Sequence, residues 1–189
     1  GEFVARAEKA LSEATSIGVS EVPEYANLIG QAETALNQAK QSLNAGQHSE
    51  AYNAAEQVMS LLSDARDALG NAVQQMVETA KASIEQARAQ EVEKYAASEL
   101  AATNAAIQAA NDALAAEDYV TAYSKAKSAQ EQAAGLSTAA LQGHARQELS
   151  VVQNRLGKAR AEGAEQYGQP IYGQVATELA RLEDQFKTG

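Results

Sequence analysis

Apolar residues recur along this chain at alternating spacings of three and four, which places them on one face of an α-helix. Three stretches share this spacing and follow one another at about seventy residues, the kind of period that marks a repeat. The first stretch comprises Ile29, Ala32, Leu36, Ala39 and Leu43. The second comprises Leu100, Thr103, Ile107, Ala110 and Leu114. The third comprises Tyr172, Val175, Leu179, Leu182 and Phe186. We call each of these sets a stripe.

A tyrosine precedes each stripe by a few residues: Tyr25, Tyr95 and Tyr167.

Each of the first two stripes ends at a predicted tight turn. Gly46 suits the left-handed residue that ends a helix, and Asp118 suits an N-cap. After each turn the helical pattern continues without a proline, which predicts two single helices of about 40 residues, on the order of 60 Å long. Four glycines predict local bending within these helices: Gly70, Gly135, Gly143 and Gly157.

We therefore predict an all-α protein with helices near residues 3–17, 24–45, 48–89, 96–116, 118–161 and 170–187. The predicted fold is a series of tandem spectrin-like three-helix bundles that share long continuous helices and form an elongated rod. The repeats are predicted at residues 1–69, 70–141 and 142–189. A single long coiled coil is disfavoured by the breaks at Pro23, Gly46 and Pro170.

Large apolar residues of the three stripes are expected to face inward: Ile29, Leu36, Leu43, Leu100, Ile107, Leu114, Leu179 and Leu182. Alanine occupies many other core positions. Because alanine lets helices approach closely but buries little area, we expect modest stability for each bundle.

The third repeat is partial, since its closing helix is absent from the sequence after Gly189. Either the chain was cut from a longer array, or another chain completes the bundle. The first residues, Gly1-Glu2-Phe3, suggest a fragment or a mature form.

Composition supports helices and limits the possible chemistry. The chain has 43 alanines and 19 glutamines but two prolines and no cysteine, which disfavours a sheet and excludes disulfides and thiol chemistry. The net charge is −10 and the basic residues are scattered, so nucleic-acid binding is disfavoured. The longest uncharged stretch, residues 132–145, is too short to span a bilayer.

The histidines and carboxylates do not form a recognisable catalytic or metal-binding motif. His48 is expected in a surface turn, and His144 lies one helical turn before Glu148. That pair could hold a metal ion weakly, but a solvated helix face is the preferred interpretation. We therefore predict no enzyme activity and no catalytic, cofactor-binding or metal site.

Two stretches, "GAEQYGQPIYGQVATELARLEDQF" and "YAASELAATNAAIQAANDALAAEDYVTAYSKAKSA", resemble helical repeats of prokaryotic cell-envelope proteins. One such family is a domain of unknown function found in envelope lipoproteins. The chain is also similar to the tandem FIVAR modules of giant bacterial surface proteins. Both turns depart from the Gly-Asp-Tyr pattern of the first family. The resemblance implies an extracellular or cell-envelope protein that acts through length and contact.

Tyr25, Tyr95 and Tyr167 are the only candidate contact residues. Each ring could close the end of a bundle, or it could contact a ligand. We predict a structural spacer or interaction module whose partner is a protein, self or neighbouring repeats included, or a glycan. The alternative is a binding module that takes a peptide, a glycan or a partner helix in a groove between helices.

Overall fold

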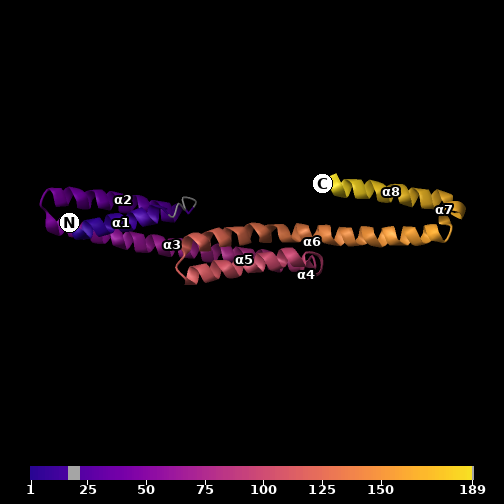
Figure 1. The fold of residues 1–189 in the computed structure, drawn as a ribbon, viewed down its shortest axis with the longest axis horizontal. Helices are drawn as coiled ribbons and strands as arrows, with labels where there is room; N and C mark the ends of the chain where they lie inside the picture. The colour runs from indigo at the N-terminus through magenta and orange to yellow at the C-terminus, as the bar shows by residue number, and fades with distance from the viewer. Residues whose placement is uncertain (17–21, 189) are drawn as a thin grey trace. The chain divides into compact units, whose positions relative to one another are not determined.

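The chain folds into α-helices. The computed structural model describes residues 1–16 and 22–188, and these residues contain no strand. In chain order the helices are α1 (Glu2–Ser16), α2 (Pro23–Asn44), α3 (His48–Arg88), α4 (Val92–Tyr95), α5 (Ala97–Ala115), α6 (Tyr119–Ala161), α7 (Ala164–Tyr167) and α8 (Gln169–Thr188) (Figure 1). The predicted all-α class is confirmed. The predicted end of the first helix, at residue 17, lies outside the described residues.

The two long helices are present at the predicted positions. Helix α3 has 41 residues and α6 has 43, and neither is interrupted at its glycines. No proline breaks either helix, and alanine is the best helix former, so local preference and hydrophobic pattern agree along both.

Contacts divide the chain into two compact units. Unit 1 comprises residues 1–84 and 101–134, and unit 2 comprises residues 85–100 and 135–189. This division follows contacts in space, whereas the predicted boundaries after residues 69 and 141 follow the repeat along the sequence. Those repeat boundaries therefore stay a prediction.

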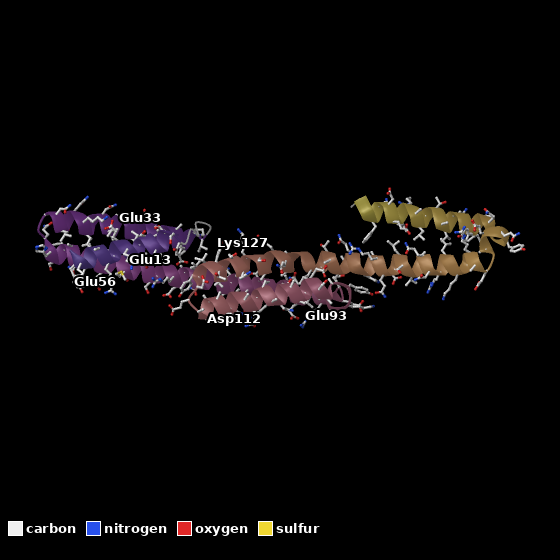
Figure 2. The ribbon with its side chains drawn as sticks, viewed as in Figure 1. Glu13, Glu33, Glu56, Glu93, Asp112 and Lys127 are labelled. Atoms are coloured by element: carbon white, nitrogen blue, oxygen red, sulfur yellow. The ribbon has the colours of Figure 1, made fainter. Side chains whose placement is uncertain are left out.

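In unit 1, α1 packs against α2 and against the beginning of α3. An ion pair joins Lys40 of α2 to Glu8 of α1, and the rings of Phe3 and Tyr52 join α1 to α3 with their centroids 4.8 Å apart. The inner face of α3 is made of small and aliphatic residues, which are buried: Ala51, Ala55, Val58, Leu62, Ala65 and Leu69. Acidic side chains lie outside, as Figure 2 shows for Glu13, Glu33 and Glu56.

Helices α2 and α5 end in the same kind of turn. Gly46 and Glu117 have left-handed backbones, with φ of 75° and 58°. In both turns the next amide donates to a carbonyl five residues back, at 2.9 Å, which is the hydrogen bond of a Schellman motif. Asp118 then caps α6, because its Oδ1 accepts a hydrogen bond from the Thr121 amide at 3.1 Å. This interaction with Thr121 lowers the pKa of the Asp118 carboxyl. The predictions for Gly46 and Asp118 are confirmed.

Two one-turn helices, α4 and α7, were not expected from the sequence pattern. Each follows a left-handed residue, Glu91 with φ of 53° or Gly163 with φ of 87°, and each ends at one of the repeated tyrosines. Four residues are too few to show a helical period, so the 3-4 spacing cannot reveal them.

The core of unit 2 becomes thin beyond residue 140. Leu179 is the only buried residue between positions 141 and 186. The second half of α6 still pairs with α8 (Figure 1), since Gln153 donates a hydrogen bond to Glu183 at 2.6 Å and Arg146 lies over the Phe186 ring. This part of unit 2 is a two-helix hairpin.

The predicted inward-facing residues fall into three groups. Four are buried: Ile29, Leu36, Ile107 and Leu179. Three are half-buried: Leu43, Leu100 and Leu114. The prediction for Leu182 is wrong, because its side chain is 41% exposed. Within the described part of unit 2, its helix packs against α6 and touches the one-turn helix α7, and 41% exposure of Leu182 shows that one side of the apolar stripe stays uncovered.

Ile107 tests whether the stripe of α5 is a core. The change Ile107→Ala should lower the free energy of unfolding by about 2–4 kcal/mol, because truncating a buried side chain loses apolar contact and leaves a cavity. Denaturant unfolding followed by circular dichroism measures this. Leu141→Ala is the control, since Leu141 is 53% exposed and should change stability little. Equal melting of Ile107→Ala and wild type would mean that the stripe is not a core.

At Gly143, helix α6 lies directly against the backbone of Tyr95 at the end of α4. A Cβ added to Gly143 would lie 2.1 Å from the carbonyl oxygen of Tyr95, far inside any real contact. Gly157, on the same helix, has nothing within 4 Å of its added Cβ. Gly143 therefore permits a close approach of α4 to α6, whereas Gly157 serves no such contact.

These two glycines give opposite expectations for the same substitution. Gly143→Ala should destabilise the protein by roughly 1–3 kcal/mol, since the backbone of Tyr95 has to move. Gly157→Ala should instead stabilise it by about 0.5–1 kcal/mol, because alanine favours the helix. Thermal and denaturant unfolding of both variants decides the matter. A neutral or stabilising Gly143→Ala would contradict the close contact.

Candidate functional site

Tyr25 is held inside unit 1. Its side chain is 4% exposed, and its hydroxyl donates a hydrogen bond to the carbonyl of Ala14 at 2.7 Å. Burial raises the pKa of this phenol, and the nearby Arg66 partly offsets the rise. The side chain joins the first turn of α2 to the end of α1. This position fits the interpretation in which the ring closes the end of a bundle.

Tyr95 lies half-buried in unit 2, at the end of α4. Its ring stacks on His144 of α6, with centroids 4.6 Å apart. Its hydroxyl accepts a hydrogen bond from Lys94 Nζ at 2.7 Å, and this bond raises the pKa of the ammonium group. The stacking fits the neighbouring close approach at Gly143, which brings the Tyr95 backbone to the same face of α6.

Tyr167 is open to solvent. It ends α7, and its side chain is 85% exposed. Its ring passes close to Gly163, where an added Cβ would meet a ring carbon at 3.3 Å. Of the three repeated tyrosines, this one presents the most surface for contact with another molecule.

The three tyrosines therefore have unlike surroundings, although the sequence places them at one position of the repeat. Within unit 2, Tyr95 and Tyr167 share no ring contact or hydrogen bond among the residues that the structure describes. A contact role for Tyr25, Tyr95 or Tyr167 stays a prediction. Tyr25 has the least accessible ring of the three, and its described role is packing.

His144 pairs with both an aromatic ring and a carboxylate. Its Nε2 lies 3.7 Å from Glu148 Oε1, and the two side chains are 49% and 62% exposed. In residues 1–16 and 22–188, no group of three or more histidine, aspartate or glutamate side chains is placed to hold a metal ion. The described contacts of His144 are the stacking on Tyr95 and a solvated contact with the Glu148 carboxylate.

A groove between α6 and α8 is a candidate site that the sequence prediction did not place. It lies entirely in unit 2 and has a volume of about 550 Å³. Side chains of both helices line it, including Val152, Arg155, Leu156, Ile171, Tyr172 and Val175. Several of these apolar side chains are open to water, with Ile171 73% exposed, Val175 41% and Val152 38%.

A second hollow, of about 440 Å³, lies in unit 1 beside the start of α2. Its lining is richer in polar groups, including Glu24, Asn71, Gln75 and Gln130. Amide and carboxylate groups of this kind can hydrogen-bond many polar ligands, so they single out no class of ligand.

Comparisons with protein-family models, with curated proteins and with solved structures found no match to the chain. The resemblance to FIVAR-like or envelope-lipoprotein repeats therefore stays a prediction. Within the described residues, no helix has both the length and the apolar character that crossing a membrane requires.

The hydrogen bond and the raised pKa of Tyr25 give a pH-dependent test. At neutral pH, Tyr25→Phe should cost about 1 kcal/mol, because the Ala14 carbonyl loses its donor. The folded-state pKa lies above the unfolded one, so the tyrosine's contribution is complete below about pH 10 and is lost as the pH rises through the folded-state value. The stability gap between wild type and Tyr25→Phe should therefore shrink in alkaline solution.

Denaturant unfolding between neutral and alkaline pH measures this gap. Tyr167→Phe is the matched control, since its hydroxyl is in water and its gap should stay near zero throughout. A Tyr25→Phe gap that does not change with pH would contradict the burial of the phenol.

Proposed function

We propose that the chain is a non-enzymatic structural spacer and interaction module of a cell-surface or cell-envelope protein. It acts through its length and through contacts between helical bundles. The observation that carries this proposal is the pair of uninterrupted helices, of 41 and 43 residues, whose buried faces are made of small apolar side chains.

The character of the interior supports the same function. Alanine makes up about half of the buried apolar residues, and Thr103 is the only buried polar residue among those described. Catalytic groups need a shielded site where their pKa values are shifted and their geometry is fixed. The acidic groups here, such as Glu93 and Asp112 in Figure 2, lie on exposed helix faces.

The second proposed function is a binding module for a peptide, a glycan or a partner helix. The apolar groove between α6 and α8 favours this alternative, since water-exposed apolar surface is typical of interaction sites. A peptide or helix suits the aliphatic lining of this groove better than a sugar does. The two functions are compatible, because a spacer can carry a docking site.

The spacer function predicts that the protein in solution is longer than a globule. A compact domain of this length has a radius of gyration of about 16 Å. Small-angle scattering should give a clearly larger radius, with a maximum dimension at or above the roughly 60 Å of a 40-residue helix. A variant with four glycines inserted after Ala134, inside α6, is the control and should change the distance distribution.

Scattering that matches a globule would contradict the spacer. So would calorimetry that shows one stoichiometric, tight site for Zn²⁺, Ca²⁺ or ATP, because the proposal assigns no chemistry to the chain.

A further inference from the structure

Unit 2 contains the same chain reversal twice. We call residues 88–96 the α4 corner and residues 160–168, which lie 72 positions later, the α7 corner. In each corner the amide of a left-handed residue, Glu91 or Gly163, donates a hydrogen bond at 3.0 Å to the carbonyl of the arginine three residues back. The tyrosine amide then donates to the carbonyl of that left-handed residue, at 3.1 Å in the α4 corner and 3.0 Å in the α7 corner. The two corners therefore share one backbone hydrogen-bond pattern.

An ion pair of the same spacing spans both corners. Arg88 Nε lies 3.2 Å from Glu93 Oε1, and Arg160 Nε lies 2.8 Å from Glu165 Oε2. Because the backbone pattern and this ion pair are common to both corners, neither can make one corner more mobile than the other. A difference in mobility has to come from the side chains that differ and from what packs against them.

The α4 corner is fixed to α6. Val92 is fully buried, and Ala96 is 2% exposed. The Tyr95 ring stacks on His144, and the Tyr95 carbonyl lies so near the Gly143 backbone that no Cβ fits between them. Movement of this corner would therefore expose apolar side chains and separate two backbones that are in contact.

The α7 corner lacks these attachments in the part of the chain that the structure describes. No residue of α7 is buried, and Tyr167, which corresponds to Tyr95, is 85% exposed. Helix α7 is also flanked by two glycines, Gly163 and Gly168, where α4 has a glutamate and an alanine. Since glycine restricts the backbone angles least, this corner can change its shape at the lower cost.

The helix that follows each corner is held to a different degree. Leu179 is the one buried residue of α8 among those described, and the hydrogen bond from Gln153 to Glu183 joins exposed groups. Contacts between exposed polar groups contribute little to stability. Helix α5, which follows the α4 corner, instead has three buried residues: Thr103, Ile107 and Ala110. Separation of α8 from its neighbour therefore loses less buried contact than separation of α5.

We propose that the α7 corner is a hinge about which α8 separates from α6, while the α4 corner stays closed. Gly163 and Gly168 absorb the change in backbone angles, as the few residues of a hinge do. The closed state covers Leu179, and the open state exposes it together with the apolar side chains of the groove. The hinge thus controls how much apolar surface of unit 2 meets water. This inference goes beyond the spacer and binding functions, because it concerns a motion and holds for either.

Distances between spin labels test the hinge in the complete chain. The sequence has no cysteine, so a pair of introduced cysteines carries the only labels. Asn154→Cys and Ala180→Cys place the labels at exposed positions of α6 and α8. Ala82→Cys and Gln108→Cys, 72 positions earlier on α3 and α5, are the matched control pair and are also exposed. Double electron–electron resonance should show a second, longer distance for the first pair and one narrow distance for the control pair.

A glycine variant tests where the hinge lies. Gly168→Ala should lower the longer-distance population about two- to fivefold, because alanine has fewer backbone conformations than glycine. The added Cβ would lie 3.1 Å from the Ala164 carbonyl oxygen, and the α4 corner accommodates an alanine, Ala96, at this position with the same backbone hydrogen bond. Gly173→Ala is the control, since it lies inside α8 with nothing within 4 Å of its added Cβ and should leave that population unchanged.

A second variant changes the population in the opposite direction. Leu179→Ala should raise the longer-distance population about tenfold or more, because it removes the one buried side chain that the closed state covers.

Three results would overturn the inference. One is a single narrow distance for both label pairs, which would mean that α8 stays closed. Another is an equal longer-distance population in both pairs, because the two corners would then open alike. The third is a population that Gly168→Ala leaves unchanged or raises, which would place the motion outside the α7 corner.

Discussion

Close approach between helices is the constraint on which the rest of this structure depends. Alanine at the contacts lets neighbouring backbones come near each other, and at Gly143 even a methyl group would collide with the Tyr95 carbonyl. Each buried methylene or methyl group adds only about 0.8 kcal/mol, so a few contacts of this kind cannot stabilise a bundle. A bundle of this kind therefore needs many small contacts. Long helices joined by tight Schellman turns provide them, because nearly every residue then lies in a helix and few lie in loops.

Local features of the fold could be predicted from the sequence, because their causes are local. The left-handed turn at Gly46 and the cap at Asp118 depend on neighbouring residues alone, and the structure has both. The long helices could be predicted because nothing in residues 48–88 or 119–161 opposes a helix. The one-turn helices were missed because a period cannot be seen in four residues.

The environment of a side chain could be predicted less well. Periodicity tells which face of α8 is apolar, but it does not tell what lies against that face, and so the expectation for Leu182 failed. The three tyrosines look alike in sequence, yet Tyr25 is enclosed and Tyr167 is in water. That difference is set by helices far away in the chain, which a local pattern does not contain. The groove was likewise expected only as a kind of site, without its residues.

The continuity of α6 has a consequence for stability. Its first half contributes buried residues such as Ala126 and Ala129, whereas its second half has none after Ala140. The hairpin of α6 and α8 therefore depends on few apolar contacts and belongs to the part of the fold that opens most readily. Any molecule that fills its groove stabilises the closed hairpin by mass action. Folding of the α6–α8 hairpin and binding in its groove are thus thermodynamically linked. At a given temperature, a higher concentration of a bound partner raises the fraction of molecules in which the second half of α6 is ordered.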